Sequence, residues 1–272
     1  MSGTAPAVSI CVLTYGDHLR LARQAIESIQ RHCCRAQYRL VVGGNAVSQD
    51  TENYLQSLCA AGEIDHLLLS PVNLNKNPMM RRMFEKVDTE FIWWFDDDSY
   101  VTESEALSRW LGPAQASPDT VVQWGQMGWC DKVAAFTEMD NVLEFVRSAP
   151  WYRGLPPPSW RPGGKGEMDF EGRGTGDGRW IFILGGCWLI RTAAVRVMDW
   201  PDPRLVKMGE DVLLGEAIRQ QGWSVADIGT PGVALDTEPR RGQSGWAVFP
   251  PTADVLHRAK HLPAPPPPHS PG

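Results

Sequence analysis

One short stretch, residues 91–101, constrains the fold of this 272-residue chain more than any other. Residues 91–95 are all β-branched or aromatic, which is typical of a strand buried on both faces inside a parallel sheet. Three carboxylates, Asp96, Asp97 and Asp98, follow this strand directly. They are therefore expected at its carboxyl end, and ligands of open α/β sheets bind beyond the carboxyl ends of the strands.

The three carboxylates indicate a bound cation. Adjacent negative charges repel one another unless a positive charge lies between them, and a divalent cation with oxygen ligands is the simplest one. Side chains alternate along an extended chain, so this spacing brings Asp96 and Asp98 to the same side. The sequence favours a metal site held by Asp96 and Asp98, and the alternative is a solvated acidic turn that caps the next helix.

Strands and helices alternate along the first hundred residues. Apolar runs predict strands at 8–14, 38–42, 64–69 and 91–95. Apolar positions at helical spacing predict helices at 19–29, 51–61 and 79–87. This alternation predicts an α/β fold with a mostly parallel, doubly wound, Rossmann-like central sheet flanked by helices.

The second part of the chain is less regular. Helices are expected at 103–111, 139–147 and 192–198 and from about 212, and strands at 120–124 and 223–228. Two short strands are expected within 180–191, hinged at Gly185 and Gly186. Residues 151–179 are rich in Gly and Pro and are expected to form a long mobile loop. The Pro-rich tail, 249–272, is expected to end in disorder.

Composition narrows the classes of partner. The formal charge of −6 disfavours a nucleic-acid partner, although a local basic groove stays open. The sequence contains no run of about 18 apolar residues, which a transmembrane segment would need, and the N-terminus lacks the basic and apolar regions of a signal peptide. The six cysteines show no C-x-x-C pair. These features favour a reduced, soluble, cytoplasmic protein, and they say nothing of its oligomeric state.

Four motifs, in order, resemble those of the GT-A fold nucleotide-sugar glycosyltransferases. Residues 8–16 resemble the opening strand of family 2 members, and residues 91–101 resemble the Asp-X-Asp strand of family 2 and of fringe-like enzymes. Gly185 and Gly186 resemble the acceptor-side Gly pair, and residues 209–215 resemble the Glu-Asp helix start of both groups. The resemblance covers roughly residues 8–228. It implies a single GT-A domain with a nucleotide-sugar half at 1–102 and an acceptor and catalytic half at 103–248.

The resemblance implies roles for the acidic residues. A Mn²⁺ or Mg²⁺ ion held by Asp96 and Asp98 would bridge the two phosphates of the donor and stabilise the leaving charge. Asp98 is the principal expected ligand, while Asp97 is expected to contact the ribose or the sugar and Asp96 can exchange roles with it. Asp211 is the expected general base of an inverting transfer, held ionised at a helix N-terminus, and Glu210 is expected to orient the acceptor. The alternative is that both residues merely stabilise the first helical turn.

The nucleotide base is expected near the ends of the first two strands. The candidates there are Thr14, Tyr15, Asp17 and Asn45, with Tyr15 stacking on a pyrimidine of a UDP-linked donor. Family 2 members usually carry acidic residues where Asn45 and its two preceding glycines stand. Cationic candidates for the diphosphate or the sugar are Lys76 and Arg81, with Arg82 as its alternative on the same helix.

The remaining candidates concern a third metal ligand and the acceptor. His257 is a candidate third ligand, with His261 and Asp236 as alternatives. Gly185, Gly186, Trp188 and Trp160 are the acceptor-side candidates. The acceptor is left open among a glycan, a lipid-linked sugar, a protein, a metabolite and a hydroxymethylated DNA base.

Two other classes of function compete with this one. A nucleotidyltransferase shares the sheet and the carboxylates, but residues 14–17 are not the Gly-rich phosphate loop that it would need. A non-catalytic sugar-binding relative would have no need of both Asp98 and Asp211.

Overall fold

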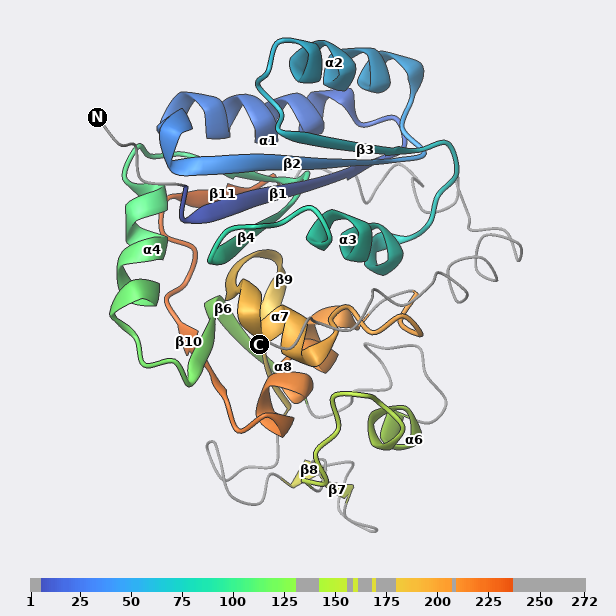
Figure 1. Ribbon diagram of the computed structural model, residues 1–272, viewed down its shortest axis with the longest axis vertical. Coiled ribbons are helices and arrows are strands. Elements are labelled where there is room, and N and C mark those ends of the chain that lie inside the picture. Colours follow the sequence, from blue (N-terminus) through green and yellow to red (C-terminus); the bar gives the residue numbers. More distant parts are fainter. Residues whose placement is uncertain are drawn as a thin grey trace, which may run out of the picture.

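A seven-stranded sheet forms the centre of the molecule (Figure 1). The computed structural model of the protein describes residues 6–130, 142–155, 159–160, 168–169, 180–206 and 209–236. In sheet order the strands are β10 (Ser224–Asp227), β6 (Val121–Cys130), β9 (Trp180–Arg191), β4 (Phe91–Asp96), β1 (Val8–Tyr15), β2 (Tyr38–Asn45) and β3 (His66–Ser70).

The sheet is mostly parallel, as the sequence predicts. β1 pairs in parallel with both β2 and β4, β2 with β3, and β10 with β6. β9 is the exception and runs antiparallel to both β4 and β6. The predicted β4 is therefore an interior strand, and its residues 91–95 are all fully buried.

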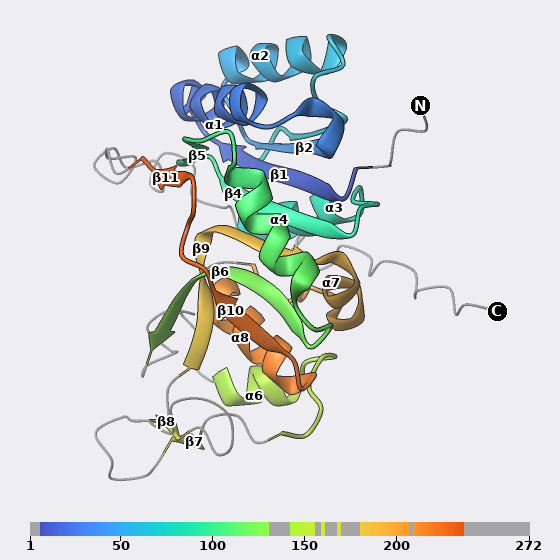
Figure 2. The ribbon, with the colours of Figure 1, turned by 90° about the vertical axis from the view of Figure 1, so that its left-hand side faces the viewer.

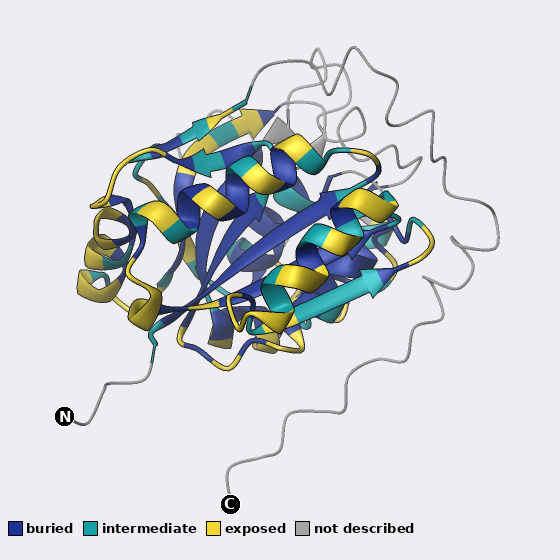
Figure 3. Ribbon diagram, turned by 90° about the horizontal axis from the view of Figure 1, so that it is seen from above, coloured by how far each residue is buried: buried dark blue, intermediate teal, exposed yellow. Residues whose placement is uncertain are grey.

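Helices cover both faces of the sheet and enclose two apolar cores. One core contains residues of α1 (Leu19–His32), α2 (Gln49–Ala60) and α4 (Ala106–Ala116). The other contains residues of α3 (Lys76–Phe84), α6 (Val142–Arg147), α7 (Thr192–Met198) and α8 (Glu210–Gln220). Figure 3 shows helices that turn exposed residues outward and buried residues toward the sheet, as amphipathic helices do. None of the helices in the described residues is long and apolar enough to cross a bilayer.

Three short elements complete the described structure. A 3₁₀ turn, η1 (Arg35–Gln37), precedes β2. β5 (Ser99–Val101) directly follows the acidic triplet and pairs antiparallel with β11 (Val233–Leu235), visible at the edge of the molecule in Figure 2. β7 (Ser159–Trp160) and β8 (Met168–Asp169) form a two-stranded ladder. The rest of the predicted loop at 151–179 beyond residue 155, apart from these two strands, lies outside the described residues.

The structure differs from the sequence prediction at β9 and α3. β9 is one strand of 12 residues rather than two short strands. The register of β6 on β9 shifts between Gly125 and Met127, next to the stretch that contains Gly185 and Gly186, so the expected hinge is an irregularity within a continuous strand. α3 begins at Lys76 instead of residue 79, directly after Asn75, whose φ of 67° lies outside the helical range.

The close approach of α8 to β9 yields a first prediction. A Cβ at Gly215 would meet the carbonyl oxygen of Ile181 and the Cβ of Phe182, so this helix packs directly on strand backbone. Gly215→Ala should lower the free energy of unfolding by about 1–3 kcal/mol despite the better helix propensity of Ala. Gly112 in α4 has no atom within 4 Å of such a Cβ, and Gly112→Ala should change stability by less than about 1 kcal/mol. Urea unfolding measures both variants, and equal stability of Gly215→Ala and wild type would contradict the packing.

Candidate active site

Asp96, the last residue of β4, is held on both of its carboxylate oxygens. Its Oδ1 accepts a hydrogen bond from Trp94 Nε1 at 3.1 Å, and its Oδ2 accepts one from Lys76 Nζ at 2.9 Å. Trp94 and Asp96 are two residues apart on one strand, so their side chains share a face of the sheet. The carboxylate is thereby fixed at the carboxyl edge of the sheet.

Lys76, the first residue of α3, links this carboxylate to α8. Its ammonium lies 2.7 Å from Glu210 Oε1 and also donates to the carbonyl oxygen of Gly185 at 3.4 Å. Burial on its own would lower the pKa of Lys76, but the carboxylates of Asp96 and Glu210 outweigh it and raise the pKa above its ordinary value. Lys76 therefore carries a permanent positive charge between two carboxylates.

Glu210 and Asp211 form the first turn of α8, as the sequence predicts. The helix starts after Gly209, which adopts a left-handed conformation with φ of 92°. Asp211 Oδ1 accepts a hydrogen bond from the amide of Val212 at 2.8 Å. Burial and the neighbouring Glu210 charge raise the pKa of Asp211 to about 6.

Gly185 of β9 lies against this cluster. A Cβ at Gly185 would stand 3.5 Å from Lys76 Nζ and 3.6 Å from both Asp211 Oδ2 and Glu210 Oε1. The structure therefore brings together the end of the acidic strand, the Gly pair and the Glu-Asp pair, which are far apart in the sequence. Two carboxylates with different partners, one paired to a lysine and one with a raised pKa, suit proton transfer.

Asp97 and Asp98 occupy the turn from β4 into β5. Asp97 is 1% exposed, and Asp98 is partly buried. The carbonyl oxygen of Asp98 accepts a hydrogen bond from the amide of Asp236 at 2.6 Å, and the Asp236 carboxylate pairs with Arg20 at 2.8 Å. Among the described residues no three His, Cys, Asp or Glu side chains group closely enough to hold a metal ion. The acidic turn therefore fits Mg²⁺ or Mn²⁺ only if one or two of its carboxylates bind the ion together with phosphate oxygens from a bound substrate.

Of the residues expected to bind the nucleotide base, Tyr15 and Asp17 are accessible, whereas Thr14 is buried. Tyr15 is half-buried and packs edge-on against His18, with ring centroids 5.3 Å apart, and Asp17 is exposed in the turn after β1. Thr14 is fully buried inside β1, which does not fit the expected contact with a nucleotide.

Asn45 also has another role than the one expected. It is 3% exposed, its Nδ2 donates to Asn73 Oδ1 at 3.0 Å and to the carbonyl of Asn75 at 3.2 Å, and its Oδ1 accepts from the amide of Leu74 at 2.8 Å. A buried amide must satisfy its hydrogen bonds, and Asn45 does so by holding the loop that leads into α3.

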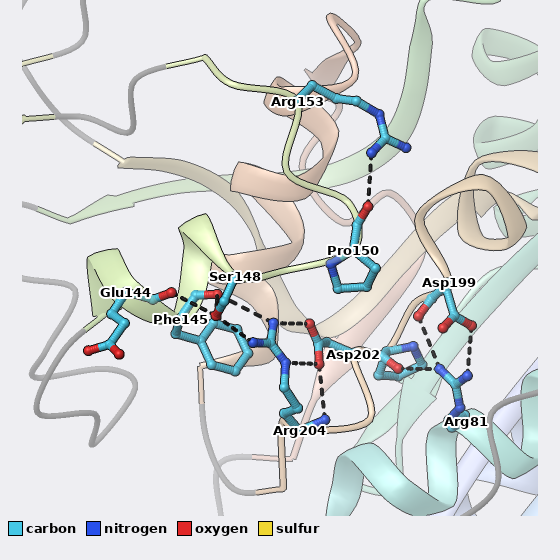
Figure 4. A network of polar contacts seen from close by, with 10 residues as sticks. Arg81, Glu144, Phe145, Ser148, Pro150, Arg153, Asp199, Asp202 and Arg204 are labelled. Carbon is cyan, nitrogen blue, oxygen red and sulfur yellow. Dashed lines mark hydrogen bonds and ion pairs between the residues drawn. The ribbon is translucent and has the colours of Figure 1, made fainter.

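Arg81 does not point at the carboxylate cluster. Its guanidinium donates to the Asp199 carboxylate at 2.7 Å and to the carbonyls of Asp199 and Pro201 at 3.0 and 2.7 Å (Figure 4). The same figure shows Arg204 bonded to Asp202 and lying over the ring of Phe145. Arg81 thus fixes α3 to the segment after α7, which corrects the expected role in donor binding.

Two of the expected acceptor residues are not confirmed. Trp188 is 2% exposed and stacks on Trp94, with ring centroids 5.7 Å apart and planes at 15°, so it belongs to the core and cannot present a face to an acceptor. The side chain of Trp160 lies outside the described residues, and so do His257 and His261. Gly186 accepts a hydrogen bond from Ser99 Oγ at 2.9 Å, which ties β9 to the strand after the acidic triplet.

Two contributors to the site went unrecognised in the sequence. Trp94 fixes Asp96, and the signal was available, because residues two apart on a strand share a face. Asn75 places Lys76, and its signal was weaker, because an Asn before a helix ordinarily indicates only a cap.

The raised pKa of Asp211 predicts how stability depends on pH. A folded-state pKa of about 6 against 3.8 for an ordinary Asp means that the folded state binds this proton more tightly. The contribution to stability is therefore complete below about pH 4 and is lost as the pH rises through 6. Asp211→Asn should be more stable than wild type at pH 8, and the difference should shrink toward pH 4.

Thermal and urea unfolding across this pH range measure the effect. Asp119, whose side chain is fully exposed, provides the control, because Asp119→Asn should give no such trend. A constant difference between Asp211→Asn and wild type at all pH values would show that burial does not disfavour the Asp211 charge.

Known proteins resemble the chain in sequence and in structure. Residues 9–197, more than half of the chain, match the family described as Glycosyl transferase family 2. No curated protein matches the chain. Among solved structures, a mannosyltransferase from Pyrobaculum calidifontis, solved with GDP-Man and Mn²⁺, aligns with a TM-score of 0.58 at 16% identity, over 97% of this chain and 67% of that one.

A second solved structure is similar in the same way. Residues 1–349 of TarS from S. aureus align with a TM-score of 0.52 at 14% identity, over 81% of this chain and 57% of that one. The chain therefore spans little more than half of the TarS fragment. Identities this low show the GT-A fold alone, but the family match extends from β1 to α7. The chain belongs to glycosyl transferase family 2.

Proposed function

We propose that the protein is a metal-dependent, inverting glycosyltransferase that moves a sugar from a nucleotide donor, most simply a UDP-sugar, to a hydroxyl of an acceptor. One observation carries this proposal. Asp211, with its raised pKa, lies beside Gly185 of β9 and next to the Lys76 bridge to Asp96 of β4. A candidate base is therefore close to both strands, β4 on the expected donor side and β9 on the expected acceptor side.

The donor is proposed to bind at the carboxyl ends of β1 and β4. Tyr15 and Asp17 provide a ring and an acceptor for the base, and Asp98 would hold a divalent cation together with phosphate oxygens. When bound, Mn²⁺ or Mg²⁺ supplies charge stabilisation for the leaving nucleoside diphosphate. The mannosyltransferase of similar fold was solved with GDP-Man and Mn²⁺, which supports a nucleotide donor and a divalent cation and makes GDP the natural comparison with UDP.

Asp211 is proposed as the general base. With a pKa of about 6 it is mostly ionised at neutral pH, yet basic enough to accept a proton from the acceptor hydroxyl. The acceptor oxygen forms a bond to the anomeric carbon as the bond to the phosphate oxygen breaks. The electron pair leaves with the nucleoside diphosphate, and the hydroxyl proton moves to Asp211.

The acceptor stays open among hydroxyl-bearing glycans, lipid-linked sugars, proteins, metabolites and modified DNA bases. A nucleotidyltransferase remains the second candidate, because the same acidic strand end would suit it. Nucleoside triphosphates would then bind in preference to diphosphates and nucleotide sugars, which one set of binding measurements distinguishes.

Two substitutions separate the donor site from the base. Asp98→Ala should abolish the Mn²⁺-dependent rise in melting temperature that a nucleoside diphosphate gives, because a ligand of the cation is lost. Asp211→Asn should keep that rise while slowing transfer by about a hundredfold to ten-thousandfold, the usual contribution of a general base. The measurement is thermal unfolding with UDP, GDP, their sugars and ATP, each with and without Mn²⁺, followed by transfer assays with the donor that binds.

Each outcome has a clear reading. Normal transfer by Asp211→Asn would exclude Asp211 as the base. A shift with ATP alone would favour the nucleotidyltransferase, and no shift with any nucleotide would remove the support for a donor site. Asp119→Asn, on the surface, should behave as wild type throughout.

The same base predicts a pH profile of transfer. Below about pH 6 Asp211 of the substrate-free protein becomes protonated and cannot accept a proton, so kcat/KM, which reports the pKa of the free enzyme, should fall with decreasing pH through that value. Initial rates between pH 5 and 8 at low substrate concentrations measure this limb. A kcat/KM that stays constant down to pH 5 would contradict the assignment.

A further inference from the structure

The ammonium of Lys76 uses all of its hydrogen-bonding capacity inside the protein. A lysine ammonium has three N–H donors, and three acceptors surround this one: Asp96 Oδ2, Glu210 Oε1 and the Gly185 carbonyl. The acceptors come from β4, α8 and β9, and Lys76 itself begins α3. A single group thus joins four elements, α3, β4, β9 and α8. Lys76 could donate a hydrogen bond to a phosphate only by breaking one of these three contacts.

The backbone that carries Lys76 is fixed as well. Asn45 bonds the amide of Leu74 and the carbonyl of Asn75, and Asn73 Oδ1 accepts from the amide of Asn75 at 2.8 Å. Asn75 itself is held at φ of 67°, a conformation that costs free energy and persists only when its surroundings impose it. The side chain of Lys76 is 23% exposed, and those of Asp96 and Glu210 are 21% and 13% exposed. Solvent screens these ion pairs only in part.

We propose that Lys76 is a positioning residue that fixes the first turn of α8, and with it Asp211, against the end of β4. Asp96, bonded on both oxygens, is the anchor of this bridge instead of a metal ligand, which leaves the cation to Asp98. The catalytic consequence rests on the proposed function of Asp211, whereas the positioning itself does not. This role replaces the direct contact with the donor diphosphate that the sequence suggested for Lys76.

Loss of the ammonium has a definite physical consequence. Asp96 and Glu210 would remain close together and partly buried with no cation between them, and like charges in that setting repel. Trp94 still holds Asp96, so Glu210 is the group that moves, and the turn that contains Asp211 moves with it. The amides of this turn, including Leu213, which bonds the Gly209 carbonyl at 3.0 Å, should then open more often.

Hydrogen exchange of the substrate-free, full-length protein tests the positioning. In Lys76→Met, amides in residues 209–215 should exchange about tenfold faster or more, as expected when a hydrogen bond to a charged group is lost. Lys76→Arg keeps the charge and should restore most of the protection. Lys86→Met, the same change at an exposed lysine near the end of α3, should leave this segment unchanged. Unchanged exchange in Lys76→Met would overturn the proposal.

Binding and kinetics distinguish the two roles of Lys76. Positioning predicts that Lys76→Met binds UDP or GDP with Mn²⁺ within about twofold of wild type while kcat falls about tenfold or more. A Kd for the diphosphate that rises about tenfold, with unchanged exchange, would instead make Lys76 a phosphate ligand. Faster exchange in a protein that binds no nucleotide at all would support the positioning and refute the proposed function, so the two fail separately.

Discussion

The position of β4 in the middle of the sheet is the constraint on which the rest of the structure depends. It pairs with β1 on one side and with β9 on the other, and helices bury both of its faces. Trp93 and Trp94 point into opposite cores, so the strand cannot slip by one residue without exchanging them. That fixed register delivers the acidic triplet to the carboxyl end of β4, beside β1 and β9.

Much of this arrangement was predictable from the sequence, because it depends on period and order. Buried strands separated by amphipathic helices specified the parallel half of the sheet, and the acidic residues after β4 and at the start of α8 marked the site. The pairing of β11 with β5 was not predictable, because three residues carry no usable period and the paired residues lie 132 to 136 positions apart in the sequence. The continuity of β9 through Gly185 was hidden for a similar reason, since glycines ordinarily indicate a break.

The wrong assignments share one physical cause. Asn45, Arg81 and Trp188 have side chains that commonly contact ligands, but only Asn45 ends a strand, whereas Arg81 lies in the last turn of α3 and Trp188 lies inside β9. In the fold each side chain contacts other parts of the protein instead of a ligand. Asn45 bonds the loop backbone, Arg81 bonds Asp199 and Pro201, and Trp188 stacks on the Trp94 ring. A buried polar group is satisfied by whatever backbone lies within reach, and the sequence does not show which backbone that will be.

Glu210 and Asp211 show how neighbours of the same charge come to differ. Both begin α8, where the helix dipole favours a negative charge, but the Lys76 ammonium bonds Glu210 alone. For Asp211, burial and the adjacent Glu210 charge outweigh the hydrogen bond from the Val212 amide and the more distant Lys76 charge, and so its pKa rises to about 6. Gly185 belongs to the same arrangement through its size, because its φ is not in the left-handed region. A Cβ at Gly185 would make ordinary van der Waals contacts with Lys76 Nζ, Glu210 and Asp211, so a longer side chain there would compete with these groups for the same space.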